Sequence, residues 1–186
     1  MAEGPSIWGV VDGQPARRYT LGDPAAGLRI SVSDFGASLL TCEMPDGKGG
    51  LVDVVLGCDD PKQVLEEGCY FGATVGRYGN RIRRGHFSLD GHNYELERNE
   101  GANHLHGGFG AYDRRFWSVA LQGPNAISFG LVSADGDGGY PGTLVAQSRY
   151  SVSGNTLTYE LLATVDKASP VNLLNHAYWN LGDGGD

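Results

Sequence analysis

A regular alternation of apolar and polar residues near the end of the chain constrains the fold most. Every second position from 157 to 165 is apolar: Leu157, Tyr159, Leu161, Ala163 and Val165. This period of two is typical of a β-strand with one face against a core. Tyr150 and Val152 alternate in the same way before the turn residues Ser-Gly-Asn at 153–155. The two segments therefore predict an antiparallel hairpin.

The same pattern recurs along the chain. Turn residues separate two further pairs of alternating segments: 87–89 from 94–96 at Asp90-Gly91, and 116–119 from 127–131 at 123–125. Thirty glycines and eight prolines, with only 19% charged residues, agree with a turn-rich β protein. Pro61 to Gly68 is the only helix candidate. We predict an all-β fold, a sandwich or a barrel, with residues 1–186 in a single domain.

Charge and cysteine content narrow the class of partner. The balance of 14 basic and 22 acidic residues gives a net charge of −8, which argues against nucleic-acid and membrane-surface partners. No segment approaches the ~20 apolar residues that span a bilayer. Cys42, Cys58 and Cys69 are odd in number and widely separated in sequence, which favours reduced thiols. We expect a cytoplasmic protein that acts on small molecules.

Two histidine segments are the candidates for chemistry. His104 and His106 lie in Asn-His-Leu-His-Gly-Gly, and an extended backbone would put both imidazoles on one face. A metal site would need His176 as a third ligand, and we expect no metal. The two glycines instead favour a close backbone approach beside His106. In a strand, His176 and Tyr178 would also share a face.

Two polar segments have other interpretations. Asn80 and Arg81, in a glycine-rich stretch, place an amide beside a fork of donors, which suits the hydroxyls of a polar ligand. Asp135 and Asp137 imitate the start of a calcium loop, but the twelfth position is Ala146, where a bidentate glutamate is required. The segment from 133 to 142 is therefore predicted to be a structured turn.

Together these segments resemble the aldose 1-epimerase (galactose mutarotase) family. The matching text, in chain order, is GRYGNRI, GHFSLDGHNYEL, NHLHGG, SADGDGGYPG and SPVNLLNHAYWNL. Order and spacing agree with the family from about Leu28 to Leu181, which corresponds to the N-terminal part of a typical family member. The order of all five segments is far more specific than any one of them.

The resemblance implies an antiparallel β-sandwich of the galactose mutarotase type, which interconverts the α and β anomers of galactose and glucose without a cofactor. His176 matches the general acid that protonates the ring oxygen, and His106 matches a histidine that hydrogen-bonds the sugar. Asn80 and Arg81 match the pair that holds sugar hydroxyls, and Tyr178 is a further substrate contact. A free imidazole has a pKa near ~6.5, which suits proton transfer in either direction at neutral pH.

The resemblance also implies that two acidic residues of the family's active site have no counterpart in this sequence. The family's general-base glutamate and a sugar-binding aspartate follow the histidine motif at a distance, and no position here matches them. We therefore expect a sandwich truncated on its C-terminal side, with little activity alone and association through exposed sheet edges. A non-catalytic carbohydrate-binding module is the alternative. A phosphosugar epimerase relative is a third option, against which the acidic composition argues.

Overall fold

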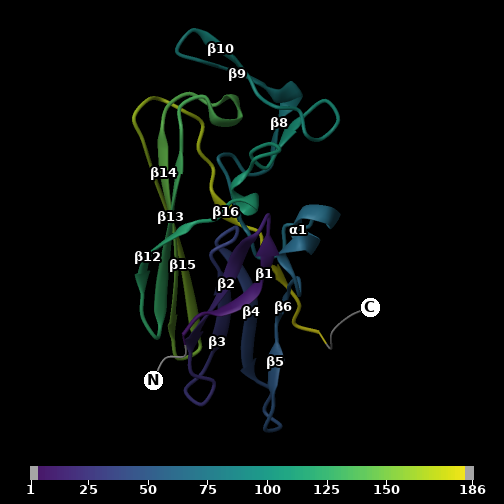
Figure 1. Ribbon diagram of the computed structural model, residues 1–186, viewed down its shortest axis with the longest axis vertical. Coiled ribbons are helices and arrows are strands. Elements are labelled where there is room, and N and C mark those ends of the chain that lie inside the picture. Colours follow the sequence, from purple (N-terminus) through teal and green to yellow (C-terminus); the bar gives the residue numbers. More distant parts are fainter. Residues whose placement is uncertain (1–3, 183–186) are drawn as a thin grey trace.

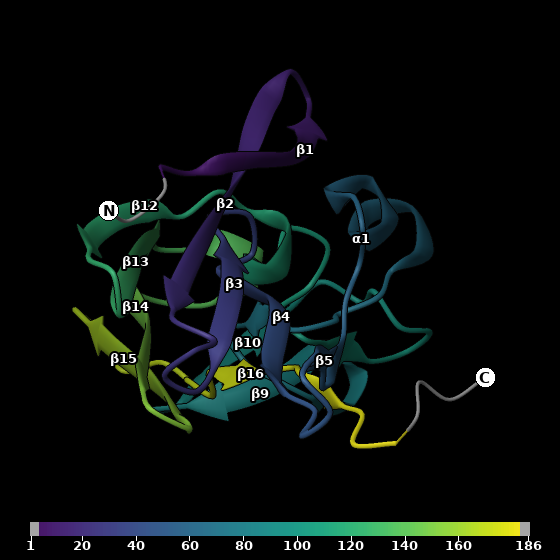
Figure 2. The same cartoon turned by 90° about the horizontal axis from the view of Figure 1, so that it is seen from below.

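Strands dominate the computed structural model, which describes residues 4–182. The larger sheet is antiparallel, with five strands in chain order: β1 (Ser6–Val11), β2 (Gln14–Gly22), β3 (Arg29–Ser33), β4 (Ser38–Pro45) and β5 (Leu51–Asp53). The second has four: β12 (Ser118–Gln122), β13 (Ala126–Ser133), β14 (Leu144–Ser153) and β15 (Thr156–Val165). The two sheets lie side by side in both views (Figure 1; Figure 2). The predicted all-β sandwich is confirmed.

The core lies between the two sheets. Side chains from both contribute to one buried cluster, which includes Tyr19, Leu21, Ile30, Val32, Ile127, Phe129, Leu144 and Tyr150. The predicted hairpin of β14 and β15 is confirmed, with Tyr150 opposite Tyr159. The apolar positions of β15 are half-buried as far as Leu161, and Val165 is exposed. Within residues 4–182, β15 pairs with β14 alone and is the edge of its sheet.

Eight short strands of the described chain lie outside the two sheets. The bounds are β6 (Val55–Leu56), β7 (Thr74–Val75), β8 (Arg81–Ile82), β9 (His86–Leu89), β10 (His92–Glu95), β11 (His104–Leu105), β16 (Leu174–Asn175) and β17 (Tyr178–Trp179). They form four antiparallel pairs: β9 with β10, β8 with β11, β7 with β16, and β6 with β17. The last two pairs return the end of the described chain to much earlier segments, with Leu174 opposite Val75 and Tyr178 opposite Leu56. The turns at 90–91 and 123–125 are hairpins as predicted.

The predicted helix is α1 (Pro61–Glu67). Asp60 caps it by accepting the Lys62 N–H, and Gly68 ends it in the left-handed conformation with φ 66°. A second apolar cluster, which includes Trp8, Phe35 and Val64, packs the helix onto the five-stranded sheet. Three 3₁₀ turns occupy Arg83–Gly85, Tyr112–Arg114 and Asp137–Gly139. No helix between residues 4 and 182 is long and apolar enough to cross a membrane.

A buried arginine organises the turn from 133 to 142. Arg77 is 1% exposed. Its guanidinium donates to the carbonyls of Pro141, Gly142, Ser133 and Ala134 and to the Ser133 hydroxyl. In the same turn, Asp137 accepts two hydrogen bonds from Arg115 at 2.6 and 2.7 Å. Asp135 accepts from the Gly142 N–H and from Lys167. The segment resembling a calcium loop is thus a turn whose carboxylates already have protein partners.

Candidate active site

A sharp bend after β11 places His106 at the site. The strand ends at Leu105, and His106, Gly107 and Gly108 then adopt positive φ values of 55°, 96° and 92°. A Cβ atom on Gly107 would lie 1.9 Å from the carbonyl oxygen of Gly76, so only glycine fits there. The predicted close backbone approach is therefore observed, and its partner is the protein's own backbone at Gly76.

His104 and His106 do not share a face, because the backbone is not extended at His106, as the shared face would require. Because the bend begins at His106, His104 points into the interior and is completely buried. Its Nδ1 lies 2.7 Å from the Glu97 carbonyl, which can only accept, so Nδ1 carries the proton. Its Nε2 then accepts from the Tyr140 hydroxyl at 2.7 Å. Burial lowers the pKa of His104, which makes it a neutral structural residue. Within residues 4–182, no three candidate ligands gather around a metal site.

Asn80 fixes both the position and the tautomer of His106. The Asn80 carbonyl accepts the His106 backbone N–H at 3.1 Å. In return the Asn80 backbone N–H donates to His106 Nδ1 at 3.0 Å. Since Nδ1 is an acceptor here, the proton of the neutral ring is on Nε2. Burial, with His176 and Arg81 nearby, lowers the pKa of His106 to about 4. At neutral pH the ring is uncharged and offers one N–H donor.

Arg81 is paired with Glu100 at the site. Its Nε donates to the two carboxylate oxygens of Glu100 at 3.0 and 2.9 Å, and Nη2 also binds this carboxylate. This hydrogen bonding lowers the pKa of Glu100, so the carboxylate is ionised at neutral pH. Asn80 Oδ1 accepts the Arg81 backbone N–H at 2.8 Å, which holds the two residues in one local arrangement. The planar guanidinium is thus oriented before any ligand arrives.

His176 lies among aromatic rings. It stacks on Tyr70 and on Tyr178, with ring centroids 5.4 and 5.0 Å away. It also meets His106 edge-on at 5.1 Å. Tyr70 contacts His106 as well, at 4.6 Å. The stacking of His176 and Tyr178 agrees with the prediction that they face the same way, although residues 176 and 177 lie between β16 and β17 rather than in one strand.

Backbone hydrogen bonds hold His176 against a distant part of the chain. Its N–H donates to the Ala73 carbonyl at 2.9 Å, and its carbonyl accepts the Gly72 N–H at 3.1 Å. Asn175 Nδ2 donates to the Gly72 carbonyl at 2.7 Å and to the buried Tyr150 hydroxyl at 3.1 Å. The ring of His176 is therefore positioned by a rigid, hydrogen-bonded backbone rather than by its own side-chain contacts alone.

A cavity of about 430 Å³ brings four of the five predicted site residues together. It is lined by Asn80, Arg81, His106, Leu174, Asn175, His176 and Ala177. Tyr178 supports His176 from the side, and its contact with a ligand stays a prediction. The cavity combines a neutral imidazole donor, a second imidazole, an amide and an oriented guanidinium. This set suits a small polyhydroxylated ligand whose protons are exchanged.

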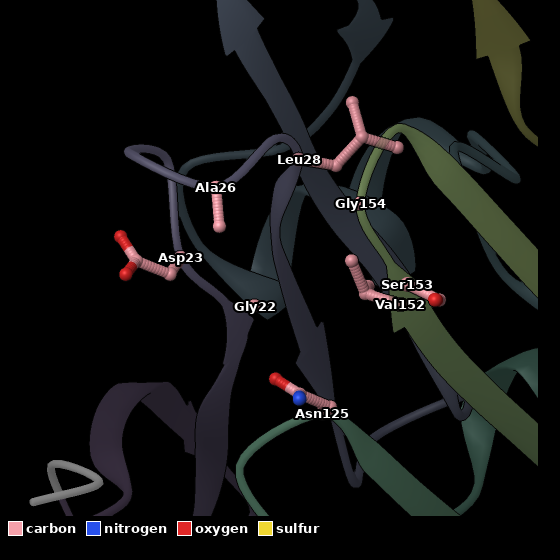
Figure 3. Close-up of a pocket in the computed structure, with 8 residues that line it drawn as sticks. All are labelled: Gly22, Asp23, Ala26, Leu28, Asn125, Val152, Ser153 and Gly154. Carbon is pink, nitrogen blue, oxygen red and sulfur yellow. The ribbon is translucent and has the colours of Figure 1, made fainter.

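A second cavity of about 360 Å³ lies between loops at the opposite end of β13–β15 from β8 and β11 (Figure 1). Figure 3 shows its lining, from Gly22, Asp23, Ala26 and Leu28 to Asn125 and residues 152–154. It contains no histidine, and its acid, Asp23, accepts the Ala25 N–H in an exposed turn. Without an acid–base pair, it is a weaker candidate for chemistry than the histidine cavity.

Comparison with known proteins decides the family. The model of the family described as aldose 1-epimerase matches residues 17–185. The chain belongs to the aldose 1-epimerase family. The aldose 1-epimerase of Escherichia coli K12 is 39% identical over 171 residues, which are 91% of this chain and 49% of that protein. The galactose mutarotase of Sus scrofa is 41% identical over 158 residues, 85% of this chain and 46% of that protein.

Solved structures agree with this family. The GalM/aldose epimerase homologue from C. elegans matches with a TM-score of 0.85 and 34% identity, over 91% of this chain and 52% of that one. The galactose 1-epimerase of Lactobacillus acidophilus matches with a TM-score of 0.81 and 30% identity, over 96% and 53%. The chain spans about half the length of the curated relatives and solved structures that it matches.

Sequence reasoning missed two residues beside this candidate site. Glu100 matched no catalytic motif, yet it pairs with Arg81 across the turn that leads into β11. Tyr70 stands outside every alternating segment, yet its ring contacts both site histidines. Neither residue has a spacing that signals its role, because both contacts depend on how distant short strands pair.

Proposed function

We propose that the protein catalyses the interconversion of α and β anomers of free aldohexoses such as galactose and glucose. The observation that carries this proposal is the edge-on pair of His106 and His176 at 5.1 Å, beside Asn80 and Arg81 in one cavity. Anomer exchange requires a proton on the ring oxygen and removal of the proton from the C1 hydroxyl. A site with two differently held imidazoles and hydroxyl-binding donors provides the first of these requirements.

In this proposal the two imidazoles have different roles. His176 protonates the ring oxygen as the C1–O5 bond breaks, and takes the proton back when the ring closes on the other face. His106 stays neutral because of its lowered pKa, and its Nε2–H donates to a sugar oxygen. Asn80 and Arg81 hold hydroxyl groups, and Tyr178 keeps the His176 ring in place. Each step moves one proton and changes no oxidation state, so the proposed reaction requires neither a metal nor a redox cofactor.

We assign the general base to a carboxylate outside residues 4–182. In the described part of the chain, Glu100 pairs directly with Arg81, which lines the cavity. Its hydrogen bonds from Arg81 lower its pKa, which makes it a poor proton acceptor. Family membership supports a second acid–base group, because ring opening needs the C1 proton to be taken up as the ring oxygen is protonated.

We further propose that residues 1–186 belong to one sandwich domain that works in the cytoplasm. One buried cluster includes side chains from both sheets, which supports a single domain. The three cysteines are free thiols, which agrees with a reducing compartment. The unpaired edge of β15 carries exposed Leu162 and Val165, so this strand is the proposed place of association when nothing covers it.

The proposed activity is tested with protein expressed from its complete reading frame. We expect freshly dissolved α-galactose to reach its equilibrium rotation faster with protein than in buffer, measured by polarimetry. A chelator such as EDTA should leave the rate unchanged, because the proposed steps use only protein side chains. A rate equal to that of buffer would contradict the proposal. If galactose still bound under those conditions, the protein would be a carbohydrate-binding module instead.

Replacing the guanidinium tests the binding role. We expect Arg81→Ala to raise the KM for galactose by about 10- to 100-fold with a smaller change in kcat, because charge-assisted hydrogen bonds to hydroxyls form in the ground state too. Initial rates over a range of galactose concentrations give both constants. The matched control is Arg98→Ala, which removes an exposed arginine that pairs with Glu95 outside the cavity. Equal effects of the two substitutions would contradict a binding role for Arg81.

A further inference from the structure

Two of the three cysteines are in contact. Cys58 Sγ and Cys69 Sγ lie 3.1 Å apart, although eleven positions separate them in the chain. Helix α1 lies between the two residues, and the segments that flank it bring the two thiols into contact. Both cysteines are partly exposed, whereas Cys42 is buried in the core between the sheets. The wide separation seen in the sequence therefore does not hold in space for this pair.

Neighbouring residues hold Cys58 and Cys69 in place. The Trp8 indole N–H donates to the Cys58 carbonyl at 3.1 Å. The Cys69 thiol lies 3.7 Å from the carbonyl of Gln63 in α1, and can donate to it. Both cysteines pack against the apolar cluster that joins α1 to the five-stranded sheet. The contact thus belongs to a packed, hydrogen-bonded region with one side open to solvent.

We propose that Cys58 and Cys69 are a redox-active dithiol that closes to a reversible disulfide in reaction with a low-molecular-weight disulfide such as oxidised glutathione. The thiolate of Cys69 attacks one sulfur of the small disulfide, forms a mixed disulfide and releases one small thiolate. Cys58 then loses its proton, and its sulfur attacks Cys69 Sγ and releases the second small thiolate. In total, two protein thiols are oxidised, one small disulfide is reduced, and two small thiols leave.

The order of attack follows from the environment of Cys58. Burial, the hydrogen bond with Cys69 and neighbouring acids raise the pKa of Cys58 to about 12. It therefore keeps its proton at neutral pH, and Cys69 opens the exchange. Once the mixed disulfide exists, Cys58 already lies against the sulfur that it must attack. This proximity offsets its small thiolate fraction.

Formation of the Cys58–Cys69 disulfide would change the surroundings of His106 and His176 through Tyr70. This residue follows Cys69 directly, and its ring contacts His106 at 4.6 Å and His176 at 5.4 Å. Bond formation draws the two sulfurs together by about 1 Å, which displaces the backbone that leads into Tyr70. The dithiol is thus linked by one residue to the cavity, whatever reaction the cavity performs.

Peptide mapping tests the modification. The protein is incubated with oxidised glutathione, alkylated, and digested with trypsin. We expect the peptides Gly49–Lys62 and Gln63–Arg77 to appear joined by a disulfide, and to separate after treatment with dithiothreitol. Cys42, in peptide Ile30–Lys48, should stay unlinked because it is buried. Peptides 49–62 and 63–77 found only unlinked, or only as separate glutathione adducts, would overturn the proposal.

Nuclear magnetic resonance of the histidine rings tests the link to the cavity. We expect the Cε1–H signals of His106 and His176 to shift on oxidation and to return on reduction. The Cys42→Ser control should keep this response, and Cys58→Ser should abolish it. Joined peptides without any shift of these two signals would overturn the link through Tyr70. Neither readout depends on mutarotation, so both outcomes are independent of the proposed activity.

Discussion

His176→Asn is expected to lower the kcat for galactose mutarotation by about 10²–10⁴-fold, with little change in KM. Asparagine has an amide of similar size and can still accept or donate a hydrogen bond, but it cannot transfer a proton. The backbone at position 176 is held by hydrogen bonds to Gly72 and Ala73, which the substitution leaves in place. The loss should therefore fall on the chemical step rather than on ligand binding.

Polarimetry at saturating and at limiting galactose separates the two constants for this variant. His86→Asn is the matched control, because His86 is exposed in β9 and does not line the histidine cavity. It should retain the parent's kcat and KM. A raised KM with an unchanged kcat in His176→Asn would show that His176 binds the sugar without transferring a proton, and the assigned role would be wrong.

Arg77→Met is expected to have the largest effect on stability, a loss of about 3–5 kcal/mol in the free energy of unfolding. The methionine fills part of the space but donates no hydrogen bonds. The carbonyls of Pro141, Gly142 and Ala134 would then be left without the guanidinium that satisfies them in the interior. An unpaired buried carbonyl loses its hydration without replacement, and several do so here together.

Urea unfolding followed by tryptophan fluorescence measures this loss. Arg83→Met is the control, since Arg83 is exposed on the surface; we expect it to change the free energy of unfolding by less than about 0.5 kcal/mol. Should Arg77→Met lose no more than this control, the guanidinium would be dispensable, and the turn from 133 to 142 would be held by its other contacts.

Local sequence signals predicted most of the fold. Asp90-Gly91 and the turn at 153–155 predicted hairpins because their conformational preferences act within a few residues. The alternation after residue 156 predicted which side of β15 faces the core. Pro61 and Gly68 marked the two ends of α1 for the same local reason.

Contacts between distant segments could not be predicted in this way. His104 and His106 point in different directions because the backbone bends at His106. The His-x-His spacing alone gives no sign of this bend. The pairing of Glu100 with Arg81, and the meeting of Cys58 with Cys69, depend on turns that return the chain. Resemblance to a family located the site histidines, but their neighbours came only from the three-dimensional structure.

The hydrogen bond between Asn175 and Gly72 joins residues 103 positions apart. Loops of this length close slowly compared with the hairpins that build either sheet. We therefore expect the cavity to be assembled late in folding, after the hairpins of both sheets. A folding intermediate with two complete sheets would have no place for a sugar, so only the native state gains from binding one. Bound galactose should therefore stabilise the native state and slow global unfolding. The site is intact only when the whole fold is intact.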